Sequence, residues 1–337
     1  MLRRLLGWLS PAGDRGRLSV LVLHRVHLVA DPLHPDDLDA MAFNRVCGWL
    51  AQLFNVLPLD EAVRRLSAGT LPARALSISF DDGYADCHDV ALPILQRHGL
   101  CATFFITTGS LDGGCMWNDL VDEAVRLAPS AVLDLRGLGI DALQQCDIGS
   151  TQRKHEACER IKRWLKYLPQ EQRQVLAQEV VARAGVKPPS DLMMSSEQVR
   201  RMYRAGMQIG AHTVSHPILA GLPAEQVRAE VGRSKQHLQS ILDAPVELFA
   251  YPNGRQGQDF DLQAIHIVRE AGFNAAVTTD WGSANRHTDP FLIPRFMPWD
   301  RTRLRFGLRM AANLHRHGGK SAAMAGCDSQ NMMPTSR

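Results

Sequence analysis

The sequence has few cysteines, no long apolar run and little excess charge of either sign, and each absence excludes a class of protein. Its seven cysteines are odd in number, scattered and free of any C-x-x-C pair, so they predict free thiols in a reducing compartment and not the disulfide framework of a small secreted domain. No apolar run reaches the roughly 18–20 residues of a membrane span. The net charge is only +3, and no Lys-rich stripe, zinc-finger or RNP pattern is present, so nucleic acid is not expected as a partner.

The composition that remains is that of a folded globular protein. Hydrophobic residues make up 45% and charged residues 22% of the 337 positions, which excludes disordered, collagen-like and low-complexity chains. The length allows one large domain or two of about 150 residues.

The N-terminal segment, residues 1–18, resembles a secretory signal only in its positive start. Its apolar core is short and ends at Ser10-Pro11, so we predict no signal peptide. Leu2, Leu5, Leu6 and Leu9 share one helical face, which favours a short helix packed on the domain, with an interfacial anchor as the alternative. The expected location is cytoplasmic or membrane-peripheral.

The rest of the chain repeats strand, loop and helix. The predicted strands are Ser19–Val26, Asn55–Leu59, Ala75–Phe80, Cys101–Thr107, Met207–His212, Val246–Pro252, Ala275–Thr279 and Phe291–Phe296. The predicted helices between them are Pro35–Leu53, Asp60–Ser67, Asp86–His98, Ser196–Ala205, Pro223–Leu242 and Asp259–Ala271. This alternation predicts an α/β fold with a parallel sheet. Seven or eight units over about 280 residues favour a (β/α) barrel over a short open sheet.

One stretch interrupts the alternation, from Trp117 to about Ser190. It shows no convincing strand and reads as helices, notably Lys154–Leu168 and Glu171–Ala184, so we expect a helical insertion on a barrel spanning residues 19–300. A C-terminal helix is predicted over residues 301–317 and a disordered tail over 318–337. The arginines of that last helix face solvent in our preferred interpretation, and contact with a membrane surface is the alternative.

Two adjacent carboxylates follow a strand in Ser79-Phe80-Asp81-Asp82-Gly83. Paired carboxylates at the end of a buried strand are costly to desolvate unless a metal ion or a shared proton absorbs the charge. Gly83 permits the sharp turn that brings both into one site. A turn in which they cap the next helix is an equally good explanation of these residues alone.

A pair of histidines follows another strand, at His212 and His216. Spaced by four positions after a strand end, they can converge on one cation. With Asp82 they would form three protein ligands with room for water and substrate. Such a set suits Zn²⁺ first, with Co²⁺, Ni²⁺ or Fe²⁺ as alternatives.

Other strand ends add polar groups. The run Tyr251-Pro252-Asn253-Gly254 is either a plain turn or a substrate-binding loop, and His24 and Arg295 also follow strand runs. In a barrel the carboxyl ends of all strands face one mouth, so these residues and the Asp–His set are expected around one pocket.

Two of these motifs, taken together, resemble those of a known family. Phe80-Asp81-Asp82-Gly83 followed by His212-Thr213-Val214-Ser215-His216 is similar to the first two motifs of the polysaccharide deacetylases, the NodB-homology or carbohydrate esterase family 4 proteins. The stretches Leu92–Leu95 and Ala102–Phe105 are also similar, and the resemblance covers about residues 19–295. It implies a distorted (β/α)₇ barrel and metal-dependent hydrolysis of acetyl groups on sugars.

Carried over by motif, the resemblance implies roles for individual residues. Asp81 would be the general base, and Asp82, His212 and His216 would hold the metal ion. A bound cation lowers the pKa of water and polarises the acetyl carbonyl, and a carboxylate base removes the proton. A backbone N–H near Tyr251 would help to stabilise the oxyanion.

The sequence also departs from the family. Ala250 stands where the third motif usually carries an arginine that orients the base, and we expect Arg295 to do this from a neighbouring strand end. The late Leu-x-His that supplies the general acid is missing. His24 is our candidate for the acid because the poly-N-acetylglucosamine deacetylase branch has a similar opening segment, and His287 is the second choice. Trp117-Asn118-Asp119 resembles a Trp-x-Asp segment of exopolysaccharide deacetylases, in which Trp117 would line a sugar groove or pack a helix.

The sequence therefore predicts an N-deacetylase acting on N-acetylated amino sugars of a polysaccharide or its lipid-linked precursor. A second interpretation is a deacylase or deformylase of a small or lipid-linked N-acyl substrate. A third, from another class, is a sugar-binding module with a decayed site. The intact Asp81, Asp82, His212 and His216 argue against decay, whereas Ala250 and the missing Leu-x-His favour it.

Overall fold

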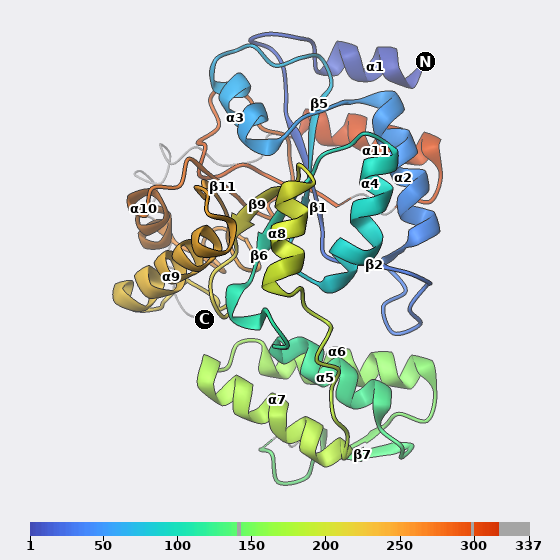
Figure 1. The fold of residues 1–337 in the computed structure, drawn as a ribbon. Helices are drawn as coiled ribbons and strands as arrows, with labels where there is room; N and C mark the ends of the chain where they lie inside the picture. Colours follow the sequence, from blue (N-terminus) through green and yellow to red (C-terminus); the bar gives the residue numbers. More distant parts are fainter. Residues whose placement is uncertain (140–142, 298–299, 317–337) are drawn as a thin grey trace, which may run out of the picture.

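The computed structural model describes residues 1–139, 143–297 and 300–316, so the expected tail over 318–337 lies outside the described residues. A parallel sheet forms the centre of the fold, in the order β1-β5-β6-β9-β10-β11, with β4 paired to β5 (Figure 1). Its strands are β1 Ser19–Leu23, β4 Asn55–Val56, β5 Ala75–Phe80, β6 Thr103–Ile106, β9 Gln208–Ala211, β10 Leu248–Ala250 and β11 Ala275–Val277. All residues of β1, β5, β6, β10 and β11 are buried, as expected for a sheet covered on both faces.

The prediction of a strand over Phe291–Phe296 is wrong, but this segment does lie between β11 and β1, where a last strand would close the barrel. Ile293 bridges Val277 of β11, and Phe296 bridges Leu21 of β1, both in parallel orientation. Pro294 lies between them and has no N–H to donate, which keeps the segment from forming a continuous ladder. These two bridges join the ends of the sheet, and the expected distorted (β/α)₇ barrel is confirmed.

Helices cover the outside of the sheet. They are α2 Ala40–Leu53, α3 Leu59–Ser67, α4 Leu92–Arg97, α8 Ser196–Arg204, α9 Ala224–Leu242 and α10 Leu262–Glu270. Capping residues set several starts: Asp39 accepts from the Ala42 N–H, and Ser195 forms a capping box with Gln198.

Two predicted helices differ from the observed ones. The helix predicted from Pro35 begins only after the Asp39 cap, because residues 38–39 form β3 and pair with β2 Val26–His27. The helix predicted over Asp86–His98 starts as a π-helical segment, η1 Cys87–Ala91, before α4. Pro93 provides no N–H to the preceding turn, which accounts for the wider turn before it.

The terminal helices pack together on the side of the barrel away from the insertion (Figure 1). α1 Leu2–Leu9 contacts α11 Arg303–His315, where Gly307 faces Leu2. Leu6 of α1 is buried, whereas Trp8 is exposed. Among the described residues, no helix is long and apolar enough to cross a membrane.

The insertion forms its own layer at the carboxyl end of the strands (Figure 1). It contains α5 Trp117–Leu127, β7 Val132–Asp134, β8 Gln145–Asp147, α6 Thr151–Leu165 and α7 Gln170–Ala184. A separate hydrophobic cluster, which includes the fully buried Val121, Ile161 and Val180, holds these elements together. The expectation of no strand here is wrong, because β7 and β8 form an antiparallel hairpin. Each strand has one buried side chain, Leu133 or Cys146, and an alternation that short gives no pattern to detect.

Candidate active site

Asp81 and Asp82 lie directly after β5 and point to different partners. The Asp81 N–H continues the sheet by donating to the Leu23 carbonyl at 2.9 Å. Asp82 and Gly83 then take positive φ angles of 76° and 94°, a region that is strained for a non-glycine residue. A Cβ at position 83 would also lie 3.2 Å from Cγ2 of Ile106, so both the backbone angle and the close contact favour glycine in this turn.

Asp81 is paired with Arg295 in the interior. Nη1 and Nη2 of Arg295 each donate to a different carboxylate oxygen of Asp81 at 2.6 Å, and Arg295 also bonds the Ser79 hydroxyl and the Thr278 carbonyl. Burial alone would raise the pKa of Asp81, but Arg295, with smaller effects from His212 and His24, holds that pKa well below its ordinary value. Asp81 is therefore an oriented carboxylate at neutral pH.

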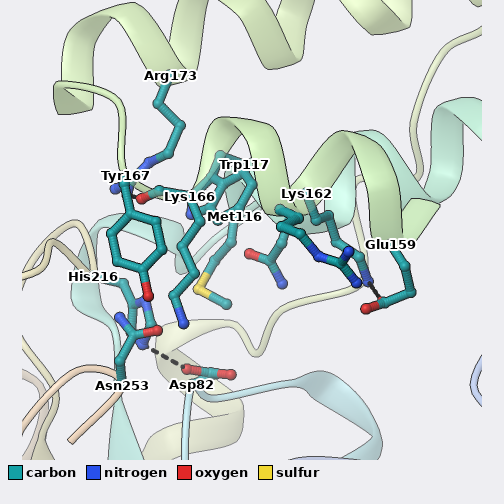
Figure 2. A pocket seen from close by; sticks show the side chains of 12 residues that line it. Asp82, Met116, Trp117, Glu159, Lys162, Lys166, Tyr167, Arg173, His216 and Asn253 are labelled. Atoms are coloured by element: carbon teal, nitrogen blue, oxygen red, sulfur yellow. Dashed lines mark hydrogen bonds and ion pairs between the residues drawn. The ribbon is translucent and has the colours of Figure 1, made fainter. Parts of the chain in front are cut away.

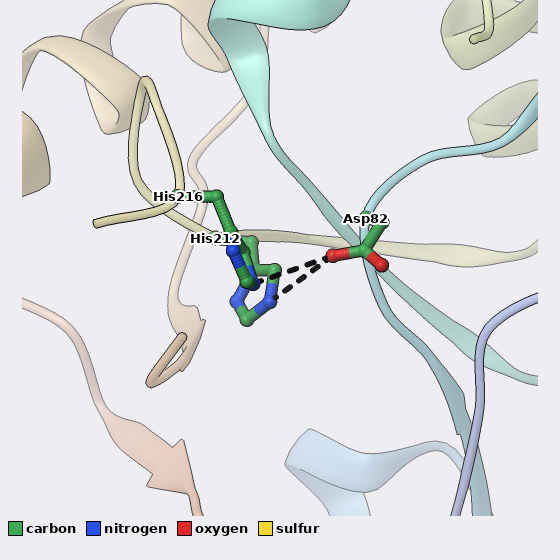
Figure 3. Close-up of side chains that lie close together, drawn as sticks. All are labelled: Asp82, His212 and His216. Carbon is green, nitrogen blue, oxygen red and sulfur yellow. Dashed lines mark ion pairs between the residues drawn. The ribbon is translucent and has the colours of Figure 1, made fainter. Parts of the chain in front are cut away.

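Asp82, His212 and His216 come together as three possible ligands (Figure 3). The Nε2 atoms of His212 and His216 lie 3.6 Å and 3.5 Å from Oδ1 of Asp82. One ligand atom from each residue lies within 4.8 Å of the others. These residues follow two strands that are separated in the sheet only by β6.

Both histidines turn a ring nitrogen toward this centre. Nδ1 of His212 lies 2.7 Å from the Ala250 carbonyl, so Nδ1 is the donor to that oxygen and the ring is held with Nε2 toward Asp82. Burial lowers the pKa of His216 to about 4, against an opposite influence of Asp82. Neutral imidazole is the form that binds a metal ion.

A divalent cation fits this donor set. Oδ1 of Asp82 is buried and has no hydrogen-bond partner among the described residues, although buried carboxylate oxygens are nearly always satisfied. A cation between Asp82 and the two Nε2 atoms would satisfy this oxygen. Two imidazoles and one carboxylate are a common ligand set for zinc and for neighbouring transition metals.

The loop that carries His216 is held by Glu230 of α9, a residue that the sequence analysis did not identify. Oε2 of Glu230 accepts from the Val214 and Ser215 N–H groups at 2.9 Å each, and Oε1 accepts from the Ser215 hydroxyl at 2.6 Å. Thr213 and His216 in this loop have positive φ angles of 65° and 55°. Glu230 therefore stabilises a backbone conformation that would otherwise be unfavourable.

A cavity of about 410 Å³ lies between the ligand residues and the insertion (Figure 2). Its barrel side includes Asp82, His216 and Asn253, and its other side is formed by Met116, Trp117, Asn118, Glu159, Lys162, Arg163, Lys166, Tyr167 and Arg173. Trp117 and Asn253 thus lie where the sequence analysis expects substrate contacts.

Tyr251 and Pro252 do not line this cavity. Tyr251 is fully buried, and its ring stacks on Phe260 with 3.9 Å between centroids. Its N–H donates to the Val277 carbonyl at 3.3 Å, so that group already has an acceptor and is not free to bind an oxyanion. Pro252 is also buried. In this loop, Asn253 takes the position at the cavity because its φ of 58° turns the chain there.

The two candidate acids lie at opposite ends of the barrel. His24 directly follows β1 next to Asp81, and its side chain is exposed, with no hydrogen bond or ion pair to another described residue. His287 lies near Ala284, which pairs with Leu18 before the start of β1. That position is at the amino end of the strands, so His287 cannot reach the Asp–His cluster.

The sequence was compared with known families and proteins. The family model described as polysaccharide deacetylase matches residues 68–132 and 158–276. The protein YxkH of Bacillus subtilis (strain 168), which carries the provisional name polysaccharide deacetylase, is 26% identical over 243 residues. That match covers 72% of this chain but only 58% of the length of YxkH.

Solved structures share the fold. IcaB from Ammonifex degensii superposes with a TM-score of 0.56 at 17% identity, over 90% of this chain and 98% of IcaB. The Streptococcus pyogenes deacetylase PplD, solved in complex with acetate, gives a TM-score of 0.55 at 19% identity, over 84% of this chain and 92% of PplD. At these identities the likeness establishes the barrel fold alone.

Proposed function

The chain belongs to the polysaccharide deacetylase family, and from this premise we propose that it is a metal-dependent hydrolase that removes N-acetyl groups from amino sugars of a polysaccharide or its lipid-linked precursor. The observation that carries the proposal is the buried Oδ1 of Asp82, which has no hydrogen-bond partner among the described residues and lies 3.6 Å and 3.5 Å from Nε2 of His212 and His216. The Asp81–Arg295 pair lies at the same end of the sheet. The location of the protein in the cell, cytoplasmic or at a membrane surface, stays a prediction that cell fractionation can test.

Asp82, His212 and His216 would hold the cation, Zn²⁺ first, with Co²⁺, Ni²⁺ or Fe²⁺ as alternatives. When bound, such a cation supplies Lewis acidity that makes water more acidic and polarises a carbonyl oxygen. The Ala250 carbonyl orients His212, and Glu230 orients the loop of His216. Both contacts fix ligand positions before the metal ion arrives.

Asp81 is the proposed general base. Water attacks the acetyl carbonyl carbon as its proton passes to Asp81, and the tetrahedral intermediate then collapses with cleavage of the C–N bond. The leaving nitrogen takes a proton from His24, which gives acetate and a free amine. Arg295 keeps the Asp81 carboxylate ionised and fixed in direction.

The size and walls of the cavity support a second candidate, hydrolysis of an acyl group on a small or lipid-linked amino sugar. The insertion covers one side of the cavity, and about 410 Å³ lies within the range of about 300–1,000 Å³ for small-ligand pockets. A decayed sugar-binding module is less well supported, because Arg295 occupies the role that Ala250 cannot fill.

Elemental analysis tests the proposal first. The purified wild type is expected to hold close to one divalent transition metal ion per chain, and His212→Ala is expected to lose it. Asp81→Asn should keep the metal but release acetate from N-acetylglucosamine oligomers about 100-fold more slowly or worse. A wild type that stays metal-free after incubation with Zn²⁺ or Co²⁺ would overturn the proposal and favour the binding module.

A further inference from the structure

The side of the cavity opposite the metal ligands is strongly basic. Lys162, Arg163, Lys166 and Arg173 line it, all from α6, α7 and the turn between them. Figure 2 shows Lys166 and Tyr167 reaching from the insertion toward Asp82, His216 and Asn253. The charges of the insertion therefore face the site where the acyl group would be cleaved.

Among the described residues, carboxylates pair with only one of these cations. Lys162 pairs with Asp122 at 3.1 Å and with Glu159 at 3.0 Å. Over the described ranges, Arg163, Lys166 and Arg173 form no ion pair with a carboxylate. Asp82 is the other acid at the cavity, and a bound cation would take up its charge.

Arg173 is the most informative of the three. It is 4% exposed, its Nη1 donates to the Lys166 carbonyl at 3.1 Å, and its guanidinium lies 5.0 Å from the centre of the Trp117 ring. No other acceptor for this guanidinium is found in the described part of the chain. A buried cation without a counter-charge is costly, and its cost falls when an anion binds beside it.

We propose that the substrate carries an anionic group, a phosphate or a carboxylate, close to the N-acyl amino sugar, and that Arg173 and Lys166 bind this group with Arg163 at the rim. This inference rests on the proposed function and specifies its substrate class. The fork of an arginine matches both kinds of oxyanion, and a flexible lysine adds a second charge. Trp117, beneath Arg173, holds the guanidinium in place by cation–π contact.

The test compares three N-acetylated sugars that differ in charge: N-acetylglucosamine, N-acetylglucosamine 1-phosphate and N-acetylmuramic acid. Acetate release and calorimetric binding are measured for the metal-loaded wild type and for the variants Arg173→Gln, Arg173→Lys and Lys166→Gln. Arg183→Gln is the matched control, because Arg183 lies on the same helix, bonds Glu179 and does not line the cavity.

The wild type is expected to bind at least one anionic sugar about 10-fold more tightly than the neutral sugar. Arg173→Gln and Lys166→Gln should remove most of this preference by weakening binding of the anionic sugar much more than binding of the neutral sugar, and Arg173→Lys should restore part of it. Tighter binding of N-acetylglucosamine 1-phosphate would identify the anionic group as a phosphate, and tighter binding of N-acetylmuramic acid would identify it as a carboxylate. Lys166 is half-buried, so Lys166→Gln carries the test if Arg173→Gln fails to fold.

Two results would overturn the inference: equal binding of charged and neutral sugars by the wild type, or equal losses for all three sugars in Lys166→Gln. Failure of the proposed function looks different. In that case no sugar releases acetate, while Arg173-dependent binding of the anionic sugar persists in calorimetry.

Discussion

Arg295 and Asp81 lie 214 positions apart, yet two N–H groups of the arginine meet the two oxygens of the carboxylate at 2.6 Å each. Arg295 is fully buried and Asp81 is 3% exposed. The arginine belongs to the segment that joins β11 to β1, so closing the barrel and orienting the carboxylate depend on the same stretch of chain.

Arg295→Lys is expected to lower kcat about 100-fold, because a lysine cannot hold both oxygens of Asp81 and the base loses its fixed direction. Loss of the second hydrogen bond also raises the pKa of Asp81, so the acidic limb of the pH–rate profile should move to higher pH. Acetate release between pH 4 and pH 9 measures both effects. Unchanged kcat, with metal content equal to that of the wild type, would remove Arg295 from the mechanism.

The sequence predicts the carboxyl end of the barrel well, because buried strands leave a clear signal. β5 is an unbroken buried run, so the Asp81-Asp82 pair could be placed at a strand end. The carboxyl ends of parallel strands share one edge, which brought His212, His216 and Arg295 to the same place. The positions of these residues in the structure agree with that reasoning.

The rest depends on contacts that have no local pattern. Glu230 reaches the His216 loop only because α9 packs next to this loop. In the sequence of α9 alone, Glu230 looks like any solvent-exposed charged residue. Arg173 and Lys166 likewise resemble the solvated face of a helix until the insertion packs against the barrel. Tyr251 was expected at the cavity because it follows a strand end, but its ring is buried and stacks on Phe260.

Glu230→Gln is expected to weaken metal affinity about 10- to 100-fold, as is usual when a group that supports a ligand is lost. The neutral amide can accept from one or two of the three donors that now share the carboxylate, so the positive-φ loop loosens. Competition with a chelator measures the affinity, and Glu225→Gln, at the start of the same helix, is the control. Equal affinities in both variants would show that the loop holds its shape without Glu230.

His24→Ala should lower kcat about 100-fold or more if His24 gives its proton to the leaving nitrogen. The metal content should stay at the wild-type level, because His24 is not among the three ligands. A substrate with a better leaving group, such as an acetyl ester, needs less help from an acid, so its kcat should fall less in His24→Ala. If the amide and the ester are affected alike, another group protonates the leaving nitrogen.

Asp119 is a buried carboxyl where the insertion meets the barrel. The Tyr84 hydroxyl donates to its Oδ1 at 3.0 Å, and Oδ2 has no hydrogen-bond partner in the described part of the chain. Burial, with Asp122 and Asp82 adding to it against the opposing influence of Arg25, raises the pKa of Asp119 from 3.8 to about 7. The carboxyl is therefore largely protonated in the folded protein at pH 6 and ionised in the unfolded chain.

This difference fixes the sign of a pH effect on stability. Between pH 4 and pH 7 the folded state binds more protons at Asp119 than the unfolded state, so the free energy of unfolding falls as the pH rises, by at most a few kcal/mol. Asp119→Asn, which resembles the protonated form, should remove this slope and be more stable than the wild type at pH 8. Urea unfolding between pH 4 and pH 8 measures the free energy of unfolding of both proteins, and Asp36→Asn, at an exposed position, is the control. A slope that survives in Asp119→Asn would assign the pH dependence to other groups and leave Asp119 ionised in its buried site.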